Sequence, residues 1–204
     1  MIIESCCTTL EEALSAQARG AYRIELCTDL SVGGVTPPHD LIRSVVNALT
    51  IPVNVLIRTR TSLDFVYSDD EIQQMIEDID YCKSAGAAGI VVGALTPEGH
   101  IDIAAMRRLI AAAKPLPVTF HRAYDVSTED PFEALEQIIA LGCTRLLTSG
   151  QAADAWEGRD LIRQLVDRAA DRLIILAGRG VTPQNIESLA TATGAREFHG
   201  TALP

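Results

Sequence analysis

Two Glu-x-Cys pairs carry the most chemically suggestive side chains in this sequence. They are Glu4-Ser-Cys6 and Glu25-Leu-Cys27, and each lies on a short apolar run typical of a β-strand. Side chains two residues apart on a strand share a face, so each glutamate shares one with its cysteine. On neighbouring strands the two thiols would come within roughly 5 to 6 Å, where thiolates could hold a soft ion such as Cu(I). Cysteine is also a common buried apolar filler, and that interpretation stays open.

The elements that must position these pairs are short strands alternating with amphipathic helices. Strands are expected at 2–6, 22–27, 53–58, 89–93, 118–122, 145–148, 173–177 and 197–199. Strict alternation predicts parallel pairing through right-handed crossovers, and eight strands are the number that closes a TIM-type (β/α)8 barrel. A doubly wound open sheet is the less favoured alternative, because no Gly-x-Gly-x-x-Gly follows the first strand. We expect a single domain over residues 1–204, with the eighth helix missing or shortened.

Start and stop signals place seven helices between these strands. Ser68 with Glu71 predicts a capping box, and Thr8 with Glu11 predicts another. Two further starts have a capping residue before proline, namely Asp130-Pro131 and Thr182-Pro183. The expected helix stops are Gly20, Gly86, Gly142 and Gly194.

Alternation along the strands brings further polar residues to the same end of the barrel. Reactive groups of a parallel barrel lie at the C-terminal ends of its strands, the barrel mouth. Besides the two cysteines, the residues expected there are Glu4, Glu25, Arg58, Arg60, His121 and His199. Buried charges of both signs are costly to desolvate unless they are paired, so this ring is either a satisfied structural network or a ligand site.

An enzyme is the alternative to metal binding at this ring. Arg58 and Arg60 could hold a phosphorylated or carboxylated metabolite, with Glu25 and His121 as the acid/base pair. The turn Gly178-Arg179-Gly180 precedes an expected helix start and is similar to an anion-binding nest. The ligand-binding residues would be Glu4, Arg58, Arg60, Gly178, Arg179, Gly180 and His199.

Composition and charge restrict the partners. The chain has 204 residues, of which 48% are hydrophobic, and a formal net charge of −10. That charge repels phosphate backbones, so no nucleic-acid partner is expected. Neither a leader nor an apolar run of membrane-spanning length is seen, so we expect no membrane partner and a cytoplasmic location. Five cysteines without a Cys-x-x-Cys favour reduced thiols over a disulfide framework.

Six motifs in order along the chain together resemble the CutC family. They are Arg23-Ile-Glu-Leu-Cys27, Gly33-Gly-Val-Thr-Pro37, Asp64-Phe-Val-Tyr-Ser-Asp69, Gly93-Ala-Leu-Thr-Pro97, Val118-Thr-Phe-His-Arg-Ala123 and Leu147-Thr-Ser-Gly150. The resemblance implies a cytoplasmic β/α barrel that forms a homo-oligomer, a dimer or tetramer, and takes part in copper homeostasis. It also implies Cu(I) as the ligand of Cys6 and Cys27.

The sequence departs from the family pattern at the ends of two strands. Arg58-Thr-Arg-Thr-Ser62 stands where the family has Arg-Pro-Arg-Gly-Gly, and Gly178-Arg-Gly180 stands where it has a run of glycines. Both arginines of the first segment are kept. Loss of the glycines is expected to stiffen that loop.

Overall fold

The computed structural model describes residues 1–201 and 203, and its eight strands close into a parallel barrel in sequence order. The strands are β1 (Ile2–Cys7), β2 (Arg23–Leu26), β3 (Val53–Leu56), β4 (Gly89–Val92), β5 (Val118–Phe120), β6 (Arg145–Thr148), β7 (Ile174–Gly178) and β8 (Glu197–Gly200). The predicted TIM-type barrel is therefore confirmed.

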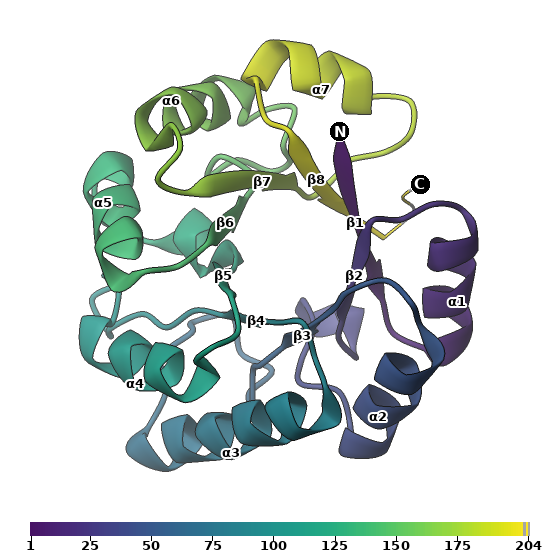
Figure 1. Ribbon diagram of the computed structural model, residues 1–204. Coiled ribbons are helices and arrows are strands. Elements are labelled where there is room, and N and C mark those ends of the chain that lie inside the picture. Colours follow the sequence, from purple (N-terminus) through teal and green to yellow (C-terminus); the bar gives the residue numbers. More distant parts are fainter. Residues whose placement is uncertain (202, 204) are drawn as a thin grey trace.

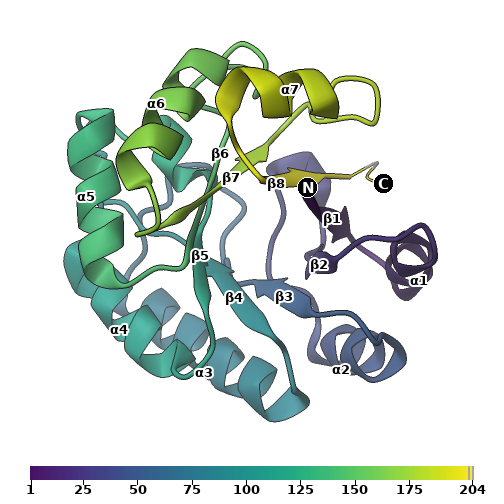
Figure 2. The same cartoon turned by 45° about the horizontal axis from the view of Figure 1, so that its top comes forward.

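Seven α-helices surround the strands (Figure 1). They are α1 (Leu10–Ala18), α2 (His39–Ala48), α3 (Asp69–Ala85), α4 (Ile103–Ala113), α5 (Pro131–Leu141), α6 (Arg159–Ala169) and α7 (Ile186–Thr193). Two short 3-10 helices, η1 (Leu30–Val32) and η2 (Arg122–Val126), follow β2 and β5. As expected, no eighth α-helix follows β8 in residues 1–201 and 203; β8 returns beside β1 between α7 and α1 (Figure 2).

Side-chain alternation sorts the strand residues into two separate clusters. The outward-facing set packs against the helices and includes Ile24, Leu26, Val55, Ile90 and Phe120, all fully buried. A small inner cluster contains Cys6, Cys27, Leu56 and Val91. The thiols thus lie on the inner faces of their strands, as alternation predicts.

Two of the predicted helix starts are wrong. The side chain of Thr9, not Thr8, caps α1 by accepting the Glu12 N–H, while the Glu12 carboxylate accepts from Thr8. The second error concerns Thr182-Pro183: α7 begins only at Ile186, because the Asn185 side chain accepts the Thr182 N–H and holds a separate turn there.

The remaining boundary signals agree with the structure or nearly so. Ser68 and Glu71 form the predicted capping box, and Asp130 caps α5 before Pro131. Three of the glycine stops, Gly86, Gly142 and Gly194, are C-caps with positive φ, whereas Gly20 lies one residue beyond the C-cap of α1. No α-helix in residues 1–201 is both long and apolar enough to cross a lipid bilayer.

Candidate functional site

The two thiols of the inner cluster touch each other at the barrel mouth. Cys6 lies near the end of β1, and Cys27 directly follows β2. Their Sγ atoms are 3.5 Å apart, and the residues are 7% and 1% exposed. Leu56 and Val91 pack against them from β3 and β4. The pair is therefore a soft, nearly dry donor set at the C-terminal ends of β1 and β2.

A glycine lets the loop after β2 cover Cys27. Gly34 has a φ of +89°, and its neighbour Gly33 has a φ of +84°; residues with a Cβ avoid this region. A Cβ on Gly34 would lie 2.8 Å from the Leu56 Cδ2 atom and 3.5 Å from the Cys27 Sγ atom. Close approach of the loop to the thiol thus requires glycine at this position.

Glu25 and His199 complete a possible metal-binding group beside Cys6. The strand register places Glu25 opposite Cys6, and the Glu25 Oε2 atom is 2.6 Å from the His199 Nε2 atom. One ligand atom from each of these three residues lies within 4.8 Å of the others. A thiolate, a carboxylate and an imidazole, with the second thiol in contact, form a donor set that transition metals accept.

Burial and charge alter the protonation of this group. The contact with Cys27, burial and the charge of Glu25 raise the pKa of Cys6, so its thiol is protonated in the metal-free protein. Burial by itself lowers the pKa of His199, but the charges of Glu25 and Glu4 outweigh it, and the net shift is upward. The imidazole therefore favours the charged form that balances these carboxylates.

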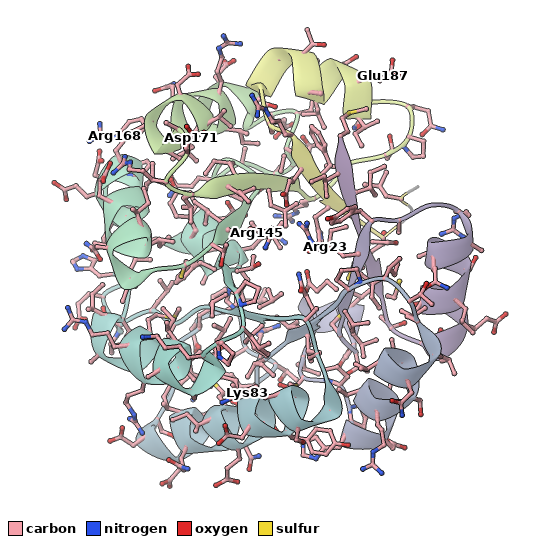
Figure 3. The ribbon with its side chains drawn as sticks, viewed as in Figure 1. Arg23, Lys83, Arg145, Arg168, Asp171 and Glu187 are labelled. Carbon is pink, nitrogen blue, oxygen red and sulfur yellow. The ribbon has the colours of Figure 1, made fainter. Side chains whose placement is uncertain are left out.

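A buried chain of ion pairs continues from this group toward the N-terminal end of the barrel. Arg23 Nε donates to Glu4 Oε2, and Arg23 Nη2 donates to Glu197 Oε2 at 2.5 Å. Arg145 Nε donates to the same Glu197 oxygen at 2.9 Å, and Glu4 Oε1 is 4.0 Å from His199 Nε2. Figure 3 shows Arg23 and Arg145 inside the ring of strands. The chain of contacts joins the base of the barrel to the His199–Glu25 pair.

The predicted arginines have other partners. The two terminal nitrogens of Arg58 donate to four backbone carbonyls, those of Val32, Gly34, Thr61 and Ser62. Arg60 does not point to the axis; it pairs with Glu71 and Asp64 and is about 29% exposed. The physical reason is that β3 ends at Leu56, so alternation no longer predicts directions beyond it.

The remaining predicted residues lie around the mouth in separate environments. His121 is 5% exposed, and its Nδ1 atom accepts the Ala123 N–H. Glu25, the expected acid/base partner of His121, contacts His199 instead. Gly178 ends β7 against His199, because a Cβ there would lie 3.3 Å from the His199 Cβ. Arg179 is exposed and has a φ of +75°. Gly180 approaches Asp154, whose Cβ would lie 2.9 Å from an added Cβ. The roles of these residues stay predictions.

Sequence reasoning missed the ionic residues beneath the mouth, although a signal for them existed. Arg23 precedes Glu25 by two residues, and Glu197 precedes His199 by two, so both share the inward face of the strand. Extending the alternation to the first residue of each strand would have found them. No comparable signal exists for Phe65 and Tyr67, because they belong to the loop after β3, where strand alternation does not apply.

Comparison with known proteins adds to this geometry. The CutC family profile matches residues 1–203. A CutC family protein from Parabacteroides distasonis is 50% identical over 203 residues, which cover 98% of this chain and 82% of that protein. The copper homeostasis protein cutC homolog of Mus musculus is 45% identical over 201 residues, covering 98% of this chain and 73% of that one.

Solved structures agree with the family match. The CutC crystal structure from Streptococcus agalactiae superposes with a TM-score of 0.95 at 35% identity and covers both chains completely. An aldolase, QR15, superposes with a TM-score of 0.74 at only 12% identity, covering 99% of this chain and 90% of its own, and so shares the barrel fold alone. This chain belongs to the CutC family.

Proposed function

We propose that this chain is a copper homeostasis protein that binds Cu(I) at the barrel mouth through the thiols of Cys6 and Cys27. The observation that carries the proposal is the 3.5 Å contact between the two Sγ atoms on neighbouring strands. Soft sulfur ligands select Cu(I) over harder ions. Relatives from mouse and human are named copper homeostasis proteins, which supports copper as the ion.

Neighbouring donors fit a third coordination position. The His199 Nε2 and Glu25 Oε2 atoms are buried and lack hydrogen-bond partners of good geometry, although they lie 2.6 Å apart as an ion pair. Either could complete the site beside Cys6. Glu4 would act from behind His199, because its Oε1 atom is 4.0 Å from the ring nitrogen.

A competition titration against a chromogenic Cu(I) chelator, in anaerobic reducing buffer, tests the proposal. The double variant Cys6→Ser, Cys27→Ser should bind Cu(I) about 100-fold more weakly than the wild type or worse, as expected when the principal ligands are lost. Cys7→Ser is the matched control: Cys7 is equally buried on the same strand but belongs to the outward-facing cluster. Equal Cu(I) affinity of the double variant and the wild type would contradict the proposal.

We place this activity in the cytoplasm, in a homo-oligomer. All five cysteines are buried and free, which suits a reducing compartment. Three large apolar side chains near the N-terminal ends of strands, Met1, Tyr22 and Ile174, are exposed in the single chain and could be covered by a second copy. Light scattering coupled to gel filtration tests the assembly, and a monomeric mass at all concentrations would contradict it.

A further inference from the structure

Arg58 is a buried cation without a carboxylate partner. The residue is 2% exposed, and its terminal nitrogens donate to four loop carbonyls at 2.6 to 3.2 Å. Carbonyl oxygens satisfy hydrogen bonds but bring no net charge. Asp64, from the same loop, already bonds Arg60 and the Val66 N–H. Within residues 1–201 and 203, no ion pair includes Arg58; the charge of Asp64 acts on it only from beyond salt-bridge distance, and a buried charge without a direct counterion is costly.

Unpartnered hydrogen-bond donors gather around this guanidinium. Eight buried side-chain nitrogen or oxygen atoms of the described residues lack a hydrogen-bond partner. Four lie in the chain of contacts along the axis, and the other four are Arg58 Nε, Thr59 Oγ1, Tyr67 Oη and His121 Nε2. Each atom of this second group can donate a proton. Since buried polar groups in native proteins are almost always paired, four unpaired donors in this part of the mouth favour an acceptor bound among them.

The donor state of His121 follows from its contacts. The Nδ1 atom accepts the Ala123 N–H at 3.1 Å, so the ring proton of a neutral imidazole resides on Nε2. Burial and the charges of Arg58 and Arg122 keep the ring neutral, with a pKa lowered to about 3. Gly93 allows this placement, because a Cβ there would lie 2.6 Å from His121 Nδ1.

Phe65 joins these groups into one cluster and covers it. Its ring centroid is 4.9 Å from that of His121, and the Arg58 Cζ atom is 5.2 Å from the Phe65 centroid. Phe65 has a φ of +55°, a conformation that a bulky side chain adopts only at a cost. Such strain is typical of segments that clamp a ligand. Burial lowers the pKa of the Arg58 guanidinium, and Tyr67, two residues beyond Phe65, lies close enough for its hydroxyl oxygen to oppose that shift as a hydrogen-bond acceptor. Burial raises the pKa of Tyr67 itself, so the hydroxyl retains its proton and can donate it to a ligand.

We propose that Arg58, Tyr67 and His121 form an oxyanion site at the mouth, which takes the carboxylate or phosphate group of a small molecule beneath Phe65. The anion would neutralise Arg58 and accept from the His121 Nε2–H and the Tyr67 hydroxyl. Thr59 supplies a further hydroxyl. None of these residues belongs to the thiol pair, so the site is additional to the proposed copper site and does not depend on it.

Thermal unfolding with two probes, sodium phosphate and sodium acetate, tests the site against sodium chloride at equal ionic strength. We expect a saturable rise in the unfolding midpoint with at least one probe, and the probe that binds identifies the group as phosphate or carboxylate. Tyr67→Phe removes only the hydroxyl and should weaken binding about tenfold. Tyr124→Phe is the matched control, because the Tyr124 hydroxyl is bonded to the Pro131 carbonyl. It should bind the probe like the wild type.

A spectroscopic measurement on the wild type keeps the test independent of variant stability. The His121 Nε2–H resonance in a 15N-labelled sample should shift as the bound probe accepts from it. The Cys6→Ser, Cys27→Ser variant should bind the probe as the wild type does, which separates this site from copper binding. No saturable effect of either probe beyond that of chloride, equal binding by Tyr67→Phe, or an unmoved His121 resonance would overturn the proposal.

Discussion

Replacing Arg23 with methionine should destabilise the fold strongly. Arg23 is 3% exposed and donates to two carboxylates, Glu4 and Glu197, whose side chains are 0% and 6% exposed. Removing one partner from a buried ion pair costs about 3–5 kcal/mol, because the charge left behind has lost its compensation. In the variant, Glu4 still accepts a hydrogen bond from the Asn54 amide and Glu197 still accepts one from Arg145, so each carboxylate retains one partner. We therefore expect a loss of about 3–5 kcal/mol, a large part of the usual 5–15 kcal/mol.

Urea unfolding followed by circular dichroism measures this loss against a matched control. Arg172→Met likewise removes two hydrogen bonds from an arginine to carboxylate oxygens, here both of Glu136 at 2.6 and 2.8 Å, but these side chains are 47% and 39% exposed. An exposed pair contributes far less to stability than a buried pair, because solvent screens the charges. If Arg23→Met were destabilised no more than Arg172→Met, the buried ion pairs would not hold the barrel together. Adding Glu4→Gln to Arg23→Met should recover part of the loss, since it removes one uncompensated charge.

Three further predictions concern the single residues His121, Ser68 and Gly34. Because the pKa of His121 is lowered to about 3, the unfolded state takes up its proton first as the pH falls below about 6.5. Stability should therefore fall by up to about 1.4 kcal/mol per pH unit between pH 6.5 and 5, and less steeply in His121→Asn, as urea midpoints would reveal. Ser68→Ala breaks the capping box of α3 and should cost about 0.5–2 kcal/mol in the same assay; no change would mean that the cap is dispensable. Gly34→Ala should cost about 1–3 kcal/mol and raise the reactivity of Cys27 toward a thiol reagent, since the new Cβ would collide with Leu56. Gly142→Ala has a similar φ but no atom within 4 Å, so it measures the backbone strain alone; equal costs and an unreactive Cys27 would refute the collision.

The period-two pattern of the strands predicted the barrel and much of its interior. Glu25 and Cys27 face inward because their neighbours Ile24 and Leu26 are apolar and pack outward. On β1, Glu4 and Cys6 face inward while Ile3 and Cys7 pack against the outer cluster. Arg23 and Glu197 obey the same rule and could have been found with it. The pairing of Arg23 with Glu197 could not be predicted, because it joins β2 to β8, which are distant in sequence.

Loops after the strands were less predictable, for a physical reason. Arg60 continues the alternation in the sequence but turns outward, since the chain leaves the strand at Leu56 and Glu71 offers a carboxylate at the start of α3. The position of Phe65 depends on a positive φ that no apolar pattern encodes. Hydrogen bonds from Arg58 to four carbonyls likewise require the folded loops to exist first.

X-ray absorption at the copper edge of protein loaded with one equivalent of Cu(I) tests the central claim most directly. The contact between Cys6 and Cys27 predicts two sulfur scatterers in the first shell. Both should remain in Cys7→Ser and disappear in Cys6→Ser, Cys27→Ser. A first shell of nitrogen and oxygen alone in the wild type, or one unchanged in the double variant, would contradict copper binding by this thiol pair.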